Sequence, residues 1–228
     1  MELRREIIEL FRRHCESMKD RLIVQKHEAE EFAADPDWPW SGLVLSFATL
    51  GGSANWDSRI KKRRGEFSWA SVSSLNNAAR GALFHELPNA RFRTKVERYI
   101  ESAFQRIRAK GGPAAVRAEY NALSSSEQRI AYFMLFDGIG EKYGRNIPMD
   151  IYDPLVRSSF ALDHRLKSIL AQLTGKSSMS YRQGEDFLQA VAHDLEIDGW
   201  TFDRVLYARY KQIMSDLEAL RAGATPPP

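Results

Sequence analysis

The segment that decides the fold reads Leu135-Phe136-Asp137-Gly138-Ile139-Gly140-Glu141-Lys142-Tyr143-Gly144-Arg145-Asn146-Ile147. An apolar helical pattern runs into a Gly-x-Gly turn, and a second helical pattern starts directly after it. The two glycines allow a left-handed backbone and a close approach to another surface. The amides of the turn and of the next helix's first turn lack partners, so we expect Gly138, Ile139 and Gly140 to bind a phosphate oxygen. The alternative is a turn that only reverses the chain. No strand precedes it, which argues against a dinucleotide-binding loop.

A second informative segment follows, in which Asp163 comes after the apolar residues Phe160, Ala161 and Leu162. A helical pattern begins at this acid, so Asp163 occupies the position of a helix N-cap. Taken alone, the residue is explained by capping, because aspartate is one of the favoured N-cap residues.

The rest of the chain indicates an all-α protein of about nine or ten helices, arranged in two lobes. Strand signals are nearly absent, whereas helical periodicity extends along most of the sequence. The sequence predicts that Ser124 caps a helix, with Glu127 completing a capping box. The expected helices cover 2–33 as one or two helices, 43–50, 71–83, 91–110, 113–120, 129–136, a helix from 141, 163–173, 181–195 and 201–221.

Composition permits several functions and excludes a few. The 228 residues carry a formal net charge of +3, which is a weak indication of a polyanionic partner. Cys15 is the only cysteine, so an intrachain disulfide, an iron–sulfur cluster and a thiolate zinc site are excluded. We find no apolar run long enough for a membrane span and no signal-like N-terminus. A reducing bacterial-type cytosol or nucleoid fits these features.

The two segments together resemble the helix-hairpin-helix, Gly/Pro-rich loop and aspartate superfamily of DNA glycosylases. Gly138, Ile139, Gly140 and Lys142 match the hairpin motif of that family, while Leu162, Asp163 and Arg165 match its second element. The resemblance implies a two-lobed helical unit over 1–222, with the shared core at about 40–210, the hairpin at about 127–147 and a disordered tail at 223–228. Asp137 departs from the family pattern, in which a proline precedes the first glycine; it could bind a cation or orient the loop.

The resemblance also implies the roles of the side chains. Lys142 would be the nucleophile of a bifunctional enzyme, and Asp163 its acidic partner, which stabilises positive charge on the sugar or moves a proton. The absence of four cluster cysteines points to the cluster-free, lysine-bearing branch, with no cofactor apart from a monovalent cation that the hairpin could bind. The expected DNA contacts are Gly138, Ile139, Gly140, Arg145, His164, Arg165 and the basic run Lys61, Lys62, Arg63 and Arg64.

An enzyme that acts on a base in duplex DNA must flip it out of the helix and into a pocket. Residues 43–50 are apolar on all sides, which predicts a buried central helix that Gly51-Gly52 ends. Ser53, Asn55 and Trp56, which follow this helix, are candidates for a wedge or for pocket contacts. Trp200 and Phe202 are candidates for the pocket lining. For all of them the simpler interpretation is that they anchor a loop or fill the core.

The predicted function is therefore that of a DNA glycosylase with AP-lyase activity, acting as a monomer on double-stranded DNA that contains a damaged base. Two alternatives stay open: a monofunctional glycosylase, and a helix-hairpin-helix protein that binds DNA without chemistry. An oxidised purine is the favoured lesion, because the cluster-free branch includes 8-oxoguanine enzymes. Oxidised pyrimidines and alkylated bases are the other options.

Overall fold

The structure is a computed structural model that describes residues 2–88 and 92–222. These residues contain helices and loops and no strand, so the predicted all-α class is confirmed. The predicted tail at 223–228 and the predicted helix start at Arg91 lie outside the described residues. Among the residues that are described, no helix combines the length and the apolar character that a bilayer crossing requires.

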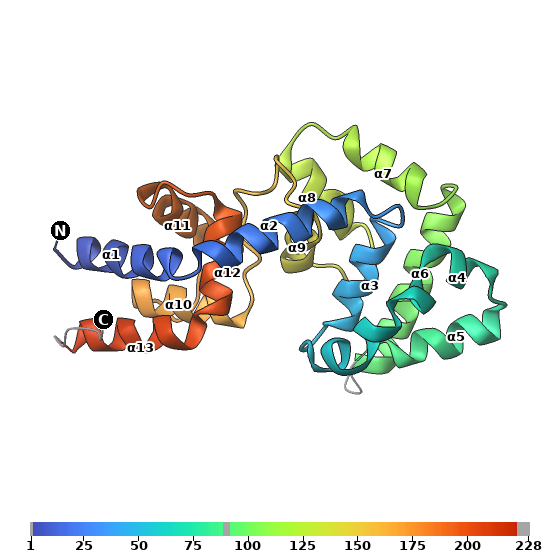
Figure 1. The fold of residues 1–228 in the computed structure, drawn as a ribbon, viewed down its shortest axis with the longest axis horizontal. Helices are drawn as coiled ribbons and strands as arrows, with labels where there is room; N and C mark the ends of the chain where they lie inside the picture. The colour runs from blue at the N-terminus through green and yellow to red at the C-terminus, as the bar shows by residue number, and fades with distance from the viewer. Residues whose placement is uncertain (1, 89–91, 223–228) are drawn as a thin grey trace. The chain divides into compact units, whose positions relative to one another are not determined.

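The chain forms two compact units (Figure 1). The hairpin unit is Glu30–Ile151, and the terminal unit combines Met1–Ala29 with Tyr152–Pro228. The hairpin unit contains the helices α3 (Trp40–Ala48), α4 (Trp69–Ser74), α5 (Asn77–Glu86), α6 (Arg93–Ala109), α7 (Pro113–Asn121), α8 (Ser126–Met134) and α9 (Glu141–Met149), with a π-helical turn at Trp56–Ile60 and a 3-10 helix at Lys61–Phe67. The terminal unit contains α1 (Glu2–Glu16), α10 (His164–Thr174), α11 (Tyr181–Asp194), α12 (Gly199–Ala208) and α13 (Tyr210–Arg221), and the chain passes from this unit to the other within α2 (Lys19–Ala34).

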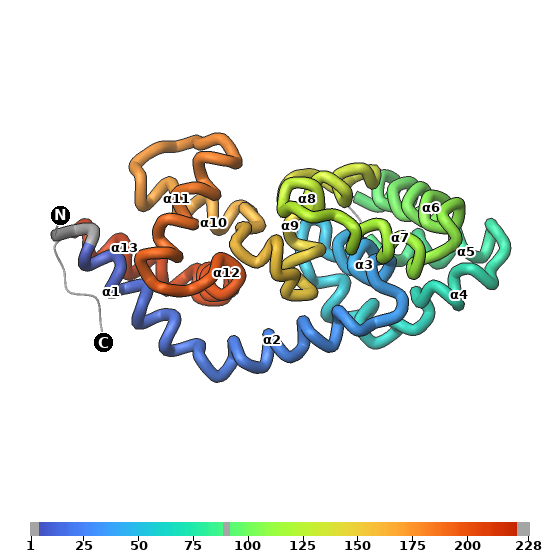
Figure 2. The backbone as a smooth tube through the Cα atoms, turned by 90° about the horizontal axis from the view of Figure 1, so that it is seen from above, coloured from blue at the N-terminus to red at the C-terminus, as the bar shows by residue number. Residues whose placement is uncertain are grey.

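The core of the hairpin unit forms around α3, which confirms the prediction of a buried central helix. Trp40 and Leu43 are fully buried, and the Trp40 indole N–H donates to the backbone oxygen of Phe67 at 2.7 Å. The helix was expected at 43–50 and runs from Trp40 to Ala48, with Thr49 as its C-cap. Gly51 and Gly52 follow with φ of +81° and +134°, a backbone that favours glycine. Within this unit α8 and α9 lie side by side, as Figure 2 shows in yellow-green and yellow.

The terminal unit has a separate core made by α1, α10, α11, α12 and α13. The ring of Phe202 on α12 is fully buried and lies edge-on to Phe11 at 5.1 Å between centroids and to Phe160 at 6.0 Å. Phe160 belongs to the non-helical segment that leads into α10. The start of α10 is therefore attached to the centre of this core.

Three predictions about helix ends need correction. The helix expected at 71–83 is two helices, because Leu75 is extended (φ −77°, ψ 143°) and the Asn76 side chain caps α5. The helix expected at 201–221 is also two, α12 and α13, which are separated at Arg209 (φ −101°, ψ 12°). No turn-forming residue stands at this break, so the helical periodicity of the sequence continues across Arg209 and predicts a single helix.

The third correction concerns the capping box before α8. The N-cap is Ser125, whose side chain accepts from the Gln128 amide, while the Gln128 side chain accepts from the Ser125 amide. The prediction used Ser124 and Glu127 and was one residue early. In a run of three serines followed by Glu-Gln, both registers satisfy the capping pattern, so sequence does not separate them.

Candidate functional site

Of the two glycines in the turn between α8 and α9, Gly138 has the left-handed backbone that the sequence predicts and Gly140 does not. Gly138 adopts φ of +81°, and a Cβ atom there would overlap the ring of Tyr99 on α6. A Cβ atom on Gly144 would lie 2.9 Å from Cγ of Met134, so this glycine allows α9 to pack closely on α8. Ile139 points into the core and is 5% exposed. The hairpin predicted at about 127–147 therefore corresponds to α8, the turn and α9.

The N-terminus of α9 is open. Gly140 is the N-cap, with φ −99° and ψ −170°, and no side chain of the described residues caps the helix. Nothing lies within 4 Å of the place where a Gly140 Cβ atom would be. The first amides of a helix have no intrahelical acceptor, so those of Glu141 and Lys142 face outward at the positive end of the helix dipole. Such an end is suited to bind an anion.

Lys142 is the second residue of α9 and is half-buried. Its Nζ lies 3.9 Å from the centroid of the Tyr143 ring, a cation–π contact with a side chain that is itself 8% exposed. Arg145, one turn further, donates to the backbone oxygen of Glu141 at 3.2 Å. The amine is thus held beside the same helix end that offers the amides.

Three side chains of α6 support the turn, and sequence analysis missed them. Ser102 donates to the Asp137 carboxylate at 2.7 Å, and Arg106 donates to the backbone oxygen of Leu135 at 2.6 Å. Tyr99 fills the space under Gly138. Of the two roles considered for Asp137, the structure shows the one that orients the loop.

Asp163 is the N-cap of α10, as predicted. Its Oδ1 accepts from the amides of Arg165 at 2.9 Å and Leu166 at 3.1 Å. Its Oδ2 lies 3.8 Å from Nδ1 of His164, and the carboxylate is 15% exposed. One carboxylate oxygen is therefore bonded by the helix amides, while the other lies near the exposed imidazole of His164.

The two residues after Asp163 contribute cationic and aromatic groups to the same surface. His164 is 80% exposed, and its ring centroid lies 6.5 Å from that of Tyr210. The Arg165 guanidinium lies 4.1 Å from the ring centroid of Tyr207, which is 47% exposed. Both expected DNA contacts are accessible. Asp163 with its neighbours belongs to the terminal unit and Lys142 to the hairpin unit.

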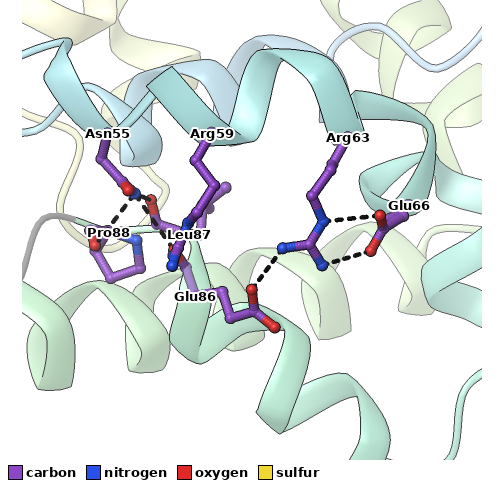
Figure 3. Close-up of polar contacts among 7 residues, drawn as sticks. All are labelled: Asn55, Arg59, Arg63, Glu66, Glu86, Leu87 and Pro88. Carbon is purple, nitrogen blue, oxygen red and sulfur yellow. Dashed lines mark hydrogen bonds and ion pairs between the residues drawn. The ribbon is translucent and has the colours of Figure 1, made fainter. Parts of the chain in front are cut away.

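The basic run is divided between scaffold and surface. Arg63 donates to Glu66 at 2.8 and 2.6 Å and to Glu86 at 2.6 Å, as Figure 3 shows. The hydrogen bond from Arg63 is the main reason why the pKa of Glu86 lies below its usual value. Lys61, Lys62 and Arg64 are exposed, and within 2–88 and 92–222 no acidic side chain pairs with them.

The Asn55 side chain is hydrogen-bonded within the hairpin unit. Its side-chain amide donates to the backbone oxygen of Leu87 at 2.7 Å and, at longer range, to those of Glu86 and Pro88 (Figure 3). These contacts favour a loop anchor over a base contact. Ser53 is exposed, and Trp56 is half-buried against the core.

Trp200 and Phe202 are core residues of the terminal unit. Trp200 is 2% exposed and lies edge-on to Tyr152 at 5.0 Å between centroids, while Phe202 is 0% exposed. Rings that are buried to this extent have no surface left for a flipped base. The structure therefore favours the core interpretation over the pocket lining that was considered for them.

No group of three or more His, Cys, Asp or Glu side chains in the described part of the chain has an arrangement that could hold a metal ion.

Comparison with known proteins identifies the fold. No family model matches the sequence, and no curated protein is significantly similar to it. The crystal structure of 8-oxoguanine DNA glycosylase from Methanocaldococcus jannaschii matches with a TM-score of 0.70 and 16% identity, over 97% of this chain and 96% of that one. The structure of that glycosylase/lyase with a 15mer DNA containing 8-oxoguanine matches with a TM-score of 0.69 and 14% identity, over 95% and 99%. The chain thus has the all-α fold that the resemblance implied.

Proposed function

We propose that this protein is a DNA glycosylase with AP-lyase activity that removes a damaged base, with an oxidised purine as the favoured lesion. One observation carries the proposal: on the fold of a solved 8-oxoguanine DNA glycosylase, an amine stands at an uncapped helix N-terminus and a separate carboxylate caps another helix with only one oxygen. A protein that only binds DNA would need the helix amides, and helix capping would account for Oδ1 of that carboxylate but not for a role of Oδ2.

In the proposed reaction the neutral amine of Lys142 attacks C1′ of the damaged nucleotide. The bond between C1′ and the base nitrogen breaks, its electron pair leaves with the base, and the base takes up a proton. Opening of the sugar ring then gives a Schiff base between Nζ and C1′. Loss of a proton from C2′ expels the 3′ phosphate by β-elimination.

Asp163 would act on the sugar through Oδ2, because its Oδ1 is held by two amides. A carboxylate at this place stabilises the positive charge that develops on the sugar as the base departs, or it moves a proton. The proposal requires that Lys142 and Asp163 reach one nucleotide.

The duplex would be held through its phosphates. The amides at the start of α9 are suited to one phosphate, and Lys61, Lys62 and Arg64 offer exposed positive charge for others. A monovalent cation bound at the hairpin, action as a monomer and a cytosolic location belong to the same proposal.

The test is incubation with duplex oligonucleotides that carry a panel of lesions, followed by borohydride trapping. We expect a trapped complex on an oxidised purine and on abasic DNA. The complex should disappear in Lys142→Ala and persist in Lys176→Ala, which removes an exposed lysine after α10. A complex undiminished in Lys142→Ala contradicts the assignment of the nucleophile.

Asp163→Asn separates chemistry from folding, because asparagine is as good an N-cap as aspartate. We expect base release to fall by about 10²–10⁴-fold at unchanged DNA affinity. Release of a base that leaves an alkali-labile site without a trapped complex identifies a monofunctional glycosylase. Binding without release from any lesion identifies a DNA-binding protein.

A further inference from the structure

Three side chains hold the backbone that leads to Asp163. Residues 158–163 form no helix, and the amides of Phe160, Ala161 and Leu162 all point to side chains of α11 and α12. Phe160 donates to Oε1 of Glu185 at 3.1 Å, Ala161 to Oδ1 of Asp203 at 3.0 Å, and Leu162 to the Tyr181 hydroxyl at 2.8 Å.

Two of these acceptors are buried carboxylates, since Glu185 is 8% exposed and Asp203 is 3% exposed. Removing a carboxylate from water is costly unless hydrogen bonds compensate it, and amide-to-carboxylate bonds are among the stronger ones. A segment that is neither helix nor strand also leaves its amides in need of acceptors. Here the amides bond the buried carboxylates, so each group satisfies the other and the segment that leads into α10 is held rigidly.

The Tyr181 hydroxyl closes this arrangement. It accepts from the Leu162 amide and donates to the backbone oxygen of Phe160 at 2.8 Å, so this side chain reinforces a turn in which the Leu162 amide also donates to the Phe160 oxygen at 3.2 Å. Leu162 directly precedes Asp163. The position of Asp163 therefore follows from contacts with α11 and α12 as well as from its own helix.

We infer that Tyr181, Glu185 and Asp203 are positioning residues that aim Oδ2 of Asp163 at the reacting sugar. This inference rests on the proposed function. The reason for such stiffness is geometric: a catalytic group displaced by about 1 Å can lose about 10²-fold in rate. None of the three needs to touch DNA for this role.

The test uses Tyr181→Phe, which removes the hydroxyl and keeps the ring. Tyr152→Phe is the matched control, because the Tyr152 hydroxyl is also hydrogen-bonded to side chains of the terminal unit, among them Asp198 at 2.7 Å, and none of these contacts involves 160–162. We expect single-turnover base release to fall by about tenfold or more in Tyr181→Phe, with duplex Kd unchanged. Tyr152→Phe should release base at the wild-type rate.

Amide hydrogen exchange provides a readout that does not depend on activity. Exchange of a peptide covering 158–166 should accelerate in Tyr181→Phe and stay as in wild type in Tyr152→Phe. Asp203→Asn, which keeps an oxygen acceptor for Ala161, should retain more activity than Asp203→Ala if the acceptor is what matters.

The outcomes distinguish this inference from the proposed function. If the wild-type protein releases no base from any lesion, the proposed function fails. If the wild type releases base and Tyr181→Phe releases it equally fast, or if Tyr181→Phe loses DNA affinity in proportion to rate, the positioning role is overturned and the proposed function stands.

Discussion

Arg63 and Arg64 are adjacent residues of one type, and the structure predicts that only one of them contacts DNA. Arg63 is bound by Glu66 and Glu86, whereas Arg64 is exposed together with Lys61 and Lys62. Arg63→Ala and Arg64→Ala each remove one positive charge, so they change the net charge equally. Any difference between them in DNA affinity must come from placement.

The magnitude follows from counterion release. Each phosphate contact contributes about 0.9 to the slope of log Kd against log salt concentration. Arg64→Ala should lower that slope by about 0.9, and loss of Lys61, Lys62 and Arg64 together by about 2.7. Between about 50 and about 200 mM salt, a slope change of about 2.7 corresponds to about 40-fold in affinity. Arg63→Ala should leave the slope unchanged and lower thermal stability, because Glu66 and Glu86 lose their partner.

The assay is a fluorescence-anisotropy titration of an undamaged duplex at several salt concentrations. An undamaged duplex isolates the phosphate contacts from base recognition. Equal slopes for Arg63→Ala and Arg64→Ala would refute the division of the run into scaffold and surface. A triple variant with the wild-type slope would show that this turn does not contact DNA.

Three further predictions concern folding and reactivity. Gly138→Ala should destabilise the fold by about 2–5 kcal/mol in urea titrations, because Gly138 combines positive φ with a close contact to Tyr99. Gly140→Ala should change the free energy of unfolding by no more than about 0.5 kcal/mol, because Gly140 has φ −99° and open space around it. Similar losses for both variants would contradict this account of the turn. Burial lowers the pKa of His14 below its ordinary 6.5, so the contribution of His14 to stability should be complete above pH 6.5 and decrease as the pH falls below it. The measurement is the urea midpoint between pH 7 and pH 5, and His14→Gln should reduce its dependence on pH. Burial raises the pKa of Cys15 to about 11, so iodoacetamide at pH 8 should modify the native chain far more slowly than the chain in urea, and equal rates would show that the thiol is accessible.

The parts of the fold that sequence predicted depend on local signals. Gly51-Gly52 ends α3, and Asp163 caps α10, because positive φ and side-chain capping are properties of a few adjacent residues. The hairpin was predicted for the same reason, since both glycines and both flanking helices lie within one short segment. Where local signals were degenerate, as in the serine run before α8, the prediction was displaced by one residue.

The parts that sequence could not predict depend on contacts between distant residues. Ser102 and Asp137 are 35 positions apart, and Ala161 and Asp203 are 42 apart. Neither the spacing nor the residue types of these two pairs indicate that the residues are in contact. Asn55 is the clearest example: beside two glycines and a tryptophan it suggested a base contact, but its amide is used by backbone oxygens 31 to 33 positions away.

In the hairpin unit and in the terminal unit alike, distant side chains hold the irregular segment that precedes a helix, α9 in the first and α10 in the second. Before α9, side chains of α6 hold an irregular turn through Asp137 and the backbone oxygen of Leu135, so no capping side chain is needed at Gly140. Before α10, side chains of α11 and α12 hold the non-helical backbone, and Asp163 caps the helix through Oδ1. In each case side chains of distant helices fix the approach to a helix N-terminus, which leaves the first amides of α9 uncapped and one oxygen of Asp163 outside the capping bonds. Asp137 stands where the sequence resemblance leads us to expect a proline, and the hydrogen bond from Ser102 to Asp137 restrains the turn that a proline ring would otherwise restrain.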